Sequence, residues 1–254
     1  IDEAKQAMEA GDILYAGKYS TPDYEKIVEQ NCGLAIENTM ILHTPEVKEQ
    51  LEKFGIHVLV DYSSYEPEPL GRTEWVKLYG LLTGHEAQAD KAFAEEKSAF
   101  EEVKNSVADE AAQEPRTVAF FYITSNGQAN VRKSADYLPK MIELAGGRYI
   151  FDSLGDEDDA MSTMSMQMEE FYAGAKDADY IIYNSTIEGE LSSVDDLLAK
   201  SPLFEKFKAV QEGHVYCTSK NLYQSTMSLG TITSDIRRML TGDDADLTYI
   251  YKLE

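Results

Sequence analysis

The 254-residue chain has few of the residues that build covalent or metal-bound frameworks. It contains two cysteines, Cys32 and Cys217, and four histidines, and none of them falls in a CxxC, HxH or HExxH spacing. Two thiols so far apart in sequence do not form a disulfide framework, and scattered histidines do not predict a zinc site. We therefore expect both cysteines to be buried, unpaired thiols and the chain to contain no metal ligands.

Basic residues are also scarce. Lysine and arginine number 23 against 46 aspartates and glutamates, which gives a net charge of −23. Such a surface repels phosphate backbones and anionic lipid headgroups, so no nucleic-acid partner is expected. No apolar run approaches the roughly 20 residues that a membrane span needs. The first residues lack the basic start and apolar core of a signal peptide.

Catalytic and cofactor motifs are absent as well. The sequence has no GxSxG, P-loop or GxGxxG, and its serines, histidines and aspartates are not spaced as a triad. The acidic run 156–159 lacks the glycine and final glutamate of a calcium loop, so we interpret it as a solvated loop. Four methionines recur at short intervals over 161–168, near an expected helix start, which favours core filling over ligation of a soft metal. We expect no catalytic residue.

What the sequence does contain is one long helical segment with an alternation of helices and strands on either side. Residues 86–107 place apolar residues at helical spacing among many charged ones, with Gly84 before them and Pro115 beyond. A helix of this length spans about 33 Å. It is either a surface helix within one domain or a strut that carries a lobe at each end.

The segments on both sides of this helix repeat a strand–loop–helix order with short connections. Before it we expect strands at 13–16, 34–36 and 57–60 and helices at 23–30, 44–54 and 72–82, with Thr21 as the cap of the first. After it we expect strands at 117–123, 149–151, 180–183 and 214–217, with a polar loop at 124–130 that opens a helix. This order predicts an α/β fold with two α/β lobes and largely parallel sheets, joined by a single long interlobe α-helix. The predicted division is 1–84 for the amino-terminal lobe, 85–110 for the interlobe helix and 111–254 for the carboxyl-terminal lobe.

Polar side chains gather in the loops that follow the expected strands, where open α/β sheets bind ligands. Aromatic, amide and hydroxyl groups with one or two arginines suit the binding of a bulky polar ligand better than bond cleavage. Each arginine also has a simpler interpretation as half of a surface ion pair. The candidate ligand-binding residues are Tyr19, Asn38, Thr39, Tyr65, Arg72, Ser125, Asn126, Arg132, Asn184, Tyr223 and Gln224.

Five segments, taken in order, carry a more specific signal than any single motif. They are TPDYEKIVEQNCGLAI, TPEVKEQLEKFGIHVLV, EPLGRTEWVKLYGLLTG, DADYIIYNST and EGHVYCTSKNLY. Together they resemble class III substrate-binding proteins of ABC transporters, the siderophore, haem and cobalamin receptors with two α/β lobes and one long helix. The resemblance covers nearly the whole chain. That family begins with a strand–helix unit that has no counterpart before Ile1, so we expect the chain to lack this unit or to be a trimmed form.

The resemblance implies an extracytoplasmic protein, periplasmic or a lipoprotein whose anchor is outside this chain. It implies a monomer, not an enzyme, that captures a siderophore-like iron chelate in an interlobe cleft and delivers it to an ABC-transporter permease dimer. It implies no resident cofactor, although the ligand would itself carry iron or cobalt. Glu25 and Glu169 (or Glu170) fall on the carboxylates that dock on the permease. Tyr19 and Asn38 fall on ligand-facing positions, and Tyr223 with Gln224 on another cleft loop.

Several alternatives remain open at this point. An anionic chelate would use the arginines, whereas haem would need an axial ligand such as Tyr19 or Met164. A corrinoid is a third possible ligand. An enzyme on a related bilobed scaffold would need an acid–base pair in the cleft. A metal-ion receptor would need several converging histidines and carboxylates, of which only His43 is well placed.

Overall fold

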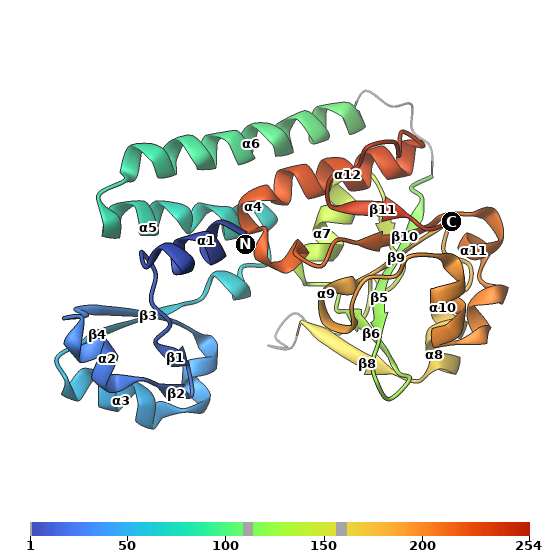
Figure 1. Ribbon diagram of the computed structural model, residues 1–254. Coiled ribbons are helices and arrows are strands. Elements are labelled where there is room, and N and C mark those ends of the chain that lie inside the picture. Colours follow the sequence, from blue (N-terminus) through green and yellow to red (C-terminus); the bar gives the residue numbers. More distant parts are fainter. Residues whose placement is uncertain (1, 109–113, 156–161) are drawn as a thin grey trace. The chain divides into compact units, whose positions relative to one another are not determined.

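The structure is a computed structural model that describes residues 2–108, 114–155 and 162–254 (Figure 1). The acidic run 156–159 and Met161 lie outside the described residues. The chain divides into two compact units, Ile1–Tyr65 and Glu66–Glu254. Both units combine helices with parallel strand pairs, which confirms the α/β class.

The first unit is a small sheet covered by helices. Its elements are α1 (Asp2–Ala10), β1 (Gly17–Lys18), β2 (Thr21–Pro22), α2 (Tyr24–Glu29), β3 (Leu34–Asn38), a 3-10 turn (Thr39–His43), α3 (Pro45–Lys53), β4 (His57–Asp61) and a second 3-10 turn (Ser63–Tyr65). Strands β3 and β4 run parallel, with Ala35 beside Val58. These two residues pack against a buried cluster that contains Ile41, Leu51 and Ile56. The alternation of packed and outward residues along β3 follows the period of two that a strand requires.

Two local predictions in the first unit are wrong. Residues 13–16 form no strand, and Thr21 belongs to β2 instead of capping α2. The cap is Asp23, whose carboxylate accepts a hydrogen bond from the Lys26 N–H (3.1 Å). Aspartate is a better cap than threonine, so Asp23 was the stronger of the two candidates. The β1–β2 turn depends on Gly17, which has φ +97° and where an added Cβ would lie only 2.6 Å from the Thr21 carbonyl oxygen.

The second unit has a seven-stranded sheet with helices on both faces. Its helices are α4 (Pro69–Glu74), α5 (Val76–Thr83), α6 (Glu86–Ala108), α7 (Tyr137–Leu144), α8 (Met168–Ala175), α9 (Ser185–Glu188), α10 (Val194–Lys200), α11 (Lys208–Glu212) and α12 (Leu229–Thr241). Its strands are β5 (Thr117–Ile123), β6 (Ala129–Arg132), β7 (Arg148–Tyr149), β8 (Thr163–Met166), β9 (Tyr180–Tyr183), β10 (Val215–Thr218) and β11 (Ile250–Lys252). Further 3-10 turns lie at Pro202–Lys206, Leu222–Gln224 and Thr226–Ser228.

The order of strands in this sheet is β11-β10-β9-β5-β6-β8, with β7 also paired to β5. The central strands β10, β9 and β5 are parallel, whereas β11, β6 and β8 add antiparallel pairs at the two sides. Alternate residues of β5 enter different cores. Phe121 packs in a cluster with Phe171 and Phe204, and Phe120 packs on the other face with Ile142 and Met239. The strand is therefore buried on both sides, which explains its uninterrupted apolar sequence.

The segment 124–136 differs from the prediction, because it contains a strand before its helix. Residues 124–128 form a hairpin turn, and β6 returns beside β5 before α7 begins. The spacing of Met164 and Met166 is also explained by a strand that the sequence analysis did not predict. Met164 and Met166 lie two apart in β8, opposite Val131 and Ala129 of β6, so their spacing is that of a strand and not of a helix start.

The long helix α6 begins at Glu86, as predicted, and is helical through Ala108, the last residue described before residue 114. Figure 1 shows it alongside α5 and α12, with which it packs inside the second unit. Its approach to α5 requires Gly80, because a Cβ at that position would lie 2.4 Å from the Cβ of Ala89. The predicted division of the chain at residues 84 and 110 into lobe, helix and lobe stays a prediction.

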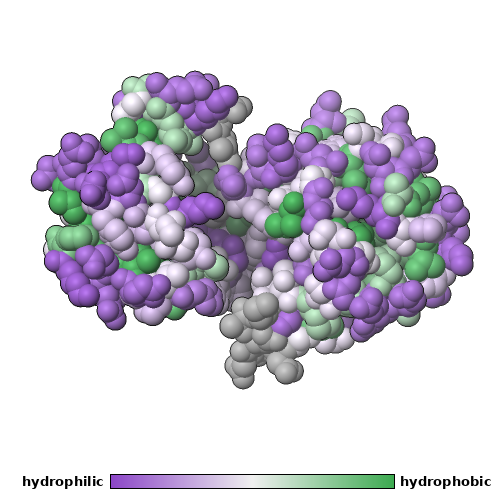
Figure 2. Space-filling model, turned by 60° about the horizontal axis from the view of Figure 1, so that its bottom comes forward, coloured by the Kyte–Doolittle hydropathy of each residue, from purple (hydrophilic) through white to green (hydrophobic). Residues whose placement is uncertain are grey.

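The composition, rich in charged residues and poor in cysteine, predicts a hydrophilic surface and unpaired thiols. On the face seen in Figure 2, hydrophilic side chains spread over both units and hydrophobic ones form separate patches. Cys32 and Cys217 are both free thiols; Cys217 is buried, as expected, whereas Cys32 is only half-buried. Among the described helices, none is long and apolar enough to cross a membrane.

Candidate ligand-binding site

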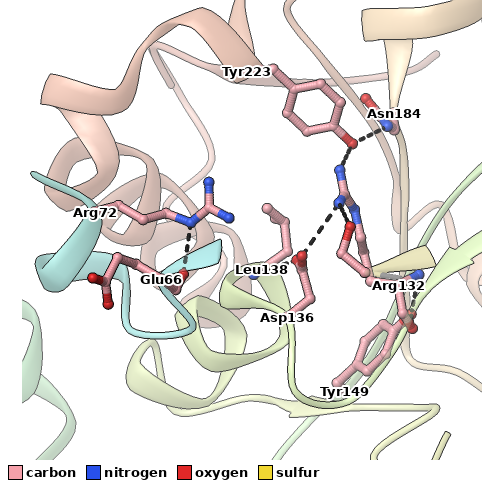
Figure 3. Close-up of polar contacts among 9 residues, drawn as sticks. Glu66, Arg72, Arg132, Asp136, Leu138, Tyr149, Asn184 and Tyr223 are labelled. Carbon is pink, nitrogen blue, oxygen red and sulfur yellow. Dashed lines mark hydrogen bonds and ion pairs between the residues drawn. The ribbon is translucent and has the colours of Figure 1, made fainter. Parts of the chain in front are cut away.

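Three of the predicted site residues meet in the second unit, although up to 91 positions separate them in sequence (Figure 3). Arg132 is the last residue of β6, Asn184 follows β9, and Tyr223 lies in the 3-10 turn after β10. The Tyr223 hydroxyl accepts a hydrogen bond from Asn184 Nδ2 (2.6 Å) and another from Arg132 Nη2. The strand ends of this sheet therefore hold a cation, an amide and a phenol in direct contact.

Arg132 is 9% exposed, and its side chain is held at several points. Nη1 lies 3.4 Å from Asp136 Oδ2 and 3.4 Å from Ser162 Oγ. The guanidinium carbon also lies 4.8 Å from the centre of the Tyr223 ring, within the range of a cation–π contact. A guanidinium fixed in this way keeps a planar set of donors in one orientation, which favours recognition of carboxylate or other oxyanion groups.

Asp136 joins Arg132 to the start of α7. Its Oδ1 accepts a hydrogen bond from the Leu138 N–H (3.0 Å), which makes Asp136 the N-cap of the helix, while Oδ2 faces Arg132. Burial raises the pKa of the Asp136 carboxyl, and the nearby Arg132 charge and the Leu138 N–H partly offset this effect. The carboxylate is thus committed to two internal partners.

Arg72, on α4, lies on the other side of Asp136 and Leu138 from Arg132 (Figure 3). Its Nε donates to the Glu66 carbonyl oxygen (3.0 Å), and its guanidinium carbon lies 3.8 Å from the centre of the Tyr137 ring. Burial lowers the pKa of Arg72, and the Arg132 charge lowers it further, against the opposite effects of Tyr137 and Asp136. The two arginines therefore share the buried Asp136 carboxylate as a counter-charge.

The remaining predicted residues of the second unit are more exposed. Ser125 and Asn126 are in the exposed turn between β5 and β6, and Gln224 is exposed next to Tyr223. Convergence of these side chains with Arg132 on one ligand stays a prediction.

The predicted residues of the first unit lie on its turns. Tyr19 is 37% exposed in the turn between β1 and β2, and Tyr65 is 54% exposed beside Tyr62. Asn38 caps the 3-10 turn that Thr39 begins, by accepting a hydrogen bond from the Met40 N–H (2.8 Å). That these residues face the same ligand as Arg132 also stays a prediction.

The two predicted docking carboxylates are exposed. Glu25 lies in the first turn of α2, and Glu169 and Glu170 lie in the first turn of α8. Acidic side chains are favourable at these positions, because the amino end of a helix carries partial positive charge.

Sequence reasoning missed Asp136, Tyr137 and Tyr149. Asp136 could have been predicted from the sequence, because an aspartate directly before a helix and four residues after an arginine indicates both a cap and an ion pair. Tyr149 gave no such signal, since its contact with Arg132 spans 17 positions. Among the described residues, no group of three or more histidines, cysteines, aspartates and glutamates could hold a metal ion.

Comparison with known proteins identifies the family. A family described as "Periplasmic binding protein" matches residues 2–222, so the chain belongs to the periplasmic binding protein family. Two uncharacterized lipoproteins of Methanocaldococcus jannaschii are 29% and 27% identical over 215 and 242 residues, which are 82% and 92% of this chain. The chain spans about half the length of these relatives, 53% and 52%.

Solved structures share the fold at low sequence identity. A periplasmic haem-binding protein from Pseudomonas aeruginosa has a TM-score of 0.73 at 16% identity, covering 98% of this chain and 86% of its own. A possible iron-binding, periplasmic solute-binding protein from Staphylococcus epidermidis has a TM-score of 0.66 at 18% identity, covering 88% and 81%. At these identities the similarity shows the fold alone. The family match confirms the resemblance to periplasmic substrate-binding proteins.

Proposed function

We propose that this chain is the ligand-binding part of an extracytoplasmic solute-binding protein that captures an anionic iron chelate for an ABC-transporter permease. The observation that carries the proposal is the fixed Arg132 guanidinium, in contact with Tyr223 and Asn184 at the strand ends and near a second arginine, Arg72. The chain has twice as many acidic as basic residues, so two interacting arginines are a departure from its general charge.

The choice of an iron-containing ligand is supported by proteins that share this fold. Structural neighbours include a possible iron-binding protein and several haem-binding proteins, and these names describe those proteins. Siderophore complexes and haem both combine iron with flat or aromatic surfaces and acidic groups. Arginine and tyrosine are suited to such ligands, because they offer charge, hydrogen bonds and ring contacts together.

The family supports delivery to a permease and an extracytoplasmic location. Two relatives are named lipoproteins, which supports attachment of the full-length protein to the outer face of a membrane. In this proposal the protein works as a monomer, binds its ligand between two lobes, and presents Glu25 and Glu169 to the permease. It performs no catalysis.

The first test is to identify the ligand that accompanies the protein when it is purified from its own host. Native mass spectrometry gives the ligand mass, and the visible spectrum separates the candidates, because haem gives an intense Soret band and a ferric catecholate a broad band at longer wavelength. We expect an iron chelate without a Soret band. A Soret band would favour haem instead, and a cobalt-containing mass a corrinoid.

The second test is titration of the ligand-free protein. Trp75 is the one tryptophan of the chain, and its Nε1 donates to the carboxylate of Glu66, whose carbonyl oxygen binds Arg72. Its fluorescence therefore reports on the Arg72 side of the site. We expect saturable quenching by a ferric tricatecholate, which is anionic, and weaker binding of an uncharged ferric trihydroxamate. Equal failure of ferric tricatecholate, ferric citrate and haemin to bind would refute the proposal.

A further inference from the structure

Glu96 breaks the pattern of the long helix α6. The buried residues Ala89, Phe100 and Val103 form one stripe along the helix, and Glu96 occupies the same stripe at 8% exposure. Its neighbour Glu95 is exposed, as a charged residue on such a helix normally is. Burial raises the pKa of Glu96, and a hydrogen bond from Gly230 partly offsets the shift. A carboxylate in a core position needs a specific reason to be there.

The Glu96 carboxylate is buried because it binds the amino end of α12. Glu96 Oε2 accepts a hydrogen bond from the N–H of Gly230, the second residue of α12, at 2.9 Å. The expected cap residue, Ser228, makes no side-chain capping bond. A carboxylate of one helix therefore caps another helix, satisfies one of its unpaired N–H groups and lies at its positive end.

The contact is close enough to fix the position of α12 against α6. A Cβ at Gly230 would lie 2.6 Å from the Cβ of Ala99 and 3.3 Å from Glu96 Oε2. Glycine is thus required at the point where the first turn of α12 meets α6, and the hydrogen bond sets the register of the two helices.

The segment held in this way leads back to Tyr223. Leu222 and Leu229 are both buried in the core on this face of the sheet, one at each end of the connection. Consecutive short turns join them, with hydrogen bonds from the Gln224 N–H to Asn221 O (2.9 Å) and from the Ser228 N–H to Ser225 O (2.9 Å). The turn Thr226–Ser228 also packs against α6. Such a chain of turns transmits the position of Gly230 to Tyr223.

We infer that Glu96 is a positioning residue, which holds the segment 219–230 so that the Tyr223 hydroxyl stays in contact with Arg132 and Asn184. The long helix then supports the ligand site directly through one carboxylate. The inference rests on the proposed function only for the statement that Tyr223 touches the ligand.

Amide hydrogen exchange of the ligand-free protein tests the positioning without any ligand. We expect E96A to raise exchange in segment 219–230 by about 2- to 30-fold, the usual effect of losing a helix cap, and to leave β5 unchanged. E96Q keeps an acceptor at the same reach and should restore most of the protection. If E96A does not fold, E96D takes its place, because its shorter side chain keeps the charge and loses the reach.

Two controls separate this effect from general destabilisation. E95A removes an exposed carboxylate from the next position and should change nothing. D235N neutralises another buried carboxylate, on α12 itself, which accepts hydrogen bonds from the Thr248 N–H (2.9 Å) and Tyr249 N–H (2.6 Å). It should raise exchange near 248–250 and not in 219–230. Unchanged exchange of 219–230 in E96A, or the same increase in E95A, would overturn the inference.

A double-mutant cycle connects the positioning to binding. Affinity for ferric tricatecholate should fall in E96A, recover in E96Q, and fall no further when E96A is added to Y223A. An equal loss in the wild-type and Y223A backgrounds would mean that Glu96 does not act through Tyr223, and would overturn the inference. If wild type does not bind this probe, the proposed function fails and hydrogen exchange still decides the role of Glu96.

Discussion

Tyr149 and the main chain of Arg132 exchange two hydrogen bonds. The Arg132 N–H donates to the Tyr149 hydroxyl (3.0 Å), and the same hydroxyl donates to the Arg132 carbonyl oxygen (2.8 Å). Tyr149 is fully buried, and burial raises the pKa of its hydroxyl, which therefore stays protonated and able to donate. The Tyr149 hydroxyl thus forms hydrogen bonds with both the main-chain N–H and the main-chain carbonyl oxygen of Arg132, whose guanidinium is the buried cation of the site.

Replacing Tyr149 by phenylalanine should lower the free energy of unfolding by about 1–3 kcal/mol, because a buried N–H and a buried carbonyl lose their partner. The change should also weaken binding of an anionic chelate, since Arg132 loses part of its anchor. Urea denaturation measures the first effect and Trp75 fluorescence titration the second. Tyr15→Phe, at a residue that is 60% exposed, is the matched control. Unchanged stability in Tyr149→Phe would contradict this interpretation of the contact.

Replacing Arg132 by alanine should distinguish ligands by their charge. For ferric tricatecholate we expect a loss of about 1–3 kcal/mol, or roughly five- to 150-fold in Kd, as for other buried anchors. The uncharged ferric trihydroxamate should be affected little. Arg148→Ala is the matched control, because Arg148 forms an exposed pair with Asp152 at 3.6 Å. An equal loss for both chelates would mean that Arg132 supports the fold of the site and not ligand charge.

Reversing the charge of Glu25 and Glu169 should impair uptake without changing ligand affinity. Both carboxylates are exposed, so Glu→Lys there disturbs no packing, while a complementary positive surface on a permease would repel the new charge. Transport by cells and affinity of the purified protein are measured for each single and for the double variant. Glu29→Lys, on the same helix α2 as Glu25, is the control. Normal transport by the double variant would remove the docking assignment.

Thiol titration should find two free thiols when the protein is denatured without reductant. In the native protein Cys32 should react faster, because it is half-buried, whereas Cys217 is fully buried and burial raises the pKa of its thiol. Cys217→Ser should remove the slow phase alone. Recovery of no thiol from the unreduced, denatured protein would contradict the prediction.

Acid should destabilise the protein through Asp179. Burial alone would raise the pKa of this carboxyl, but hydrogen bonds from Lys208 Nζ (2.6 Å) and from the Thr117 N–H (2.7 Å) and hydroxyl bring it below its ordinary value. A lowered native pKa adds stability above the unfolded pKa of about 3.9, and this stability is lost as the pH falls through the native value. Asp179→Asn should therefore differ from wild type at neutral pH and converge with it in acid. Asp177→Asn, with a side chain 80% exposed, should show no such convergence.

The parts of the fold that were predictable are those with a strong local pattern. The apolar run of β5 and the helical periodicity of α6 each demand one conformation, and both were placed within a residue or two. Strand β6, the second strand of the hairpin, was missed, because a four-residue strand with polar residues resembles a loop. Strand pairing decides such a segment, and pairing is not a local property.

The candidate site also has features that were predictable from the sequence and features that were not. Asn184 and Tyr223 were identifiable because they follow parallel strands, whose carboxyl ends meet at one edge of a sheet. Arg132 was expected in the loop and helix after β5, and it instead ends the antiparallel strand β6. The contacts among these three residues could not be predicted, since the 39 and 91 positions between them fix no geometry until the sheet order is known. Glu96 was the opposite case. Its neighbours in sequence, Glu95 and Lys97, are exposed charged residues, and only the close packing of α12 at Gly230 shows that Glu96 is buried.

An anionic ligand must approach a chain whose net charge is −23. At low ionic strength this repulsion extends over about 30 Å, whereas attraction to Arg132 and Arg72 acts only at close range. Added salt screens the long-range part first, so the association rate constant should increase as ionic strength rises towards about 0.1 M, where the screening length is near 10 Å. The repulsion scales with the charge of the anion, so a chelate with several negative charges is slowed more than a singly charged inorganic anion. The salt dependence of the association rate would then report the charge of the ligand directly.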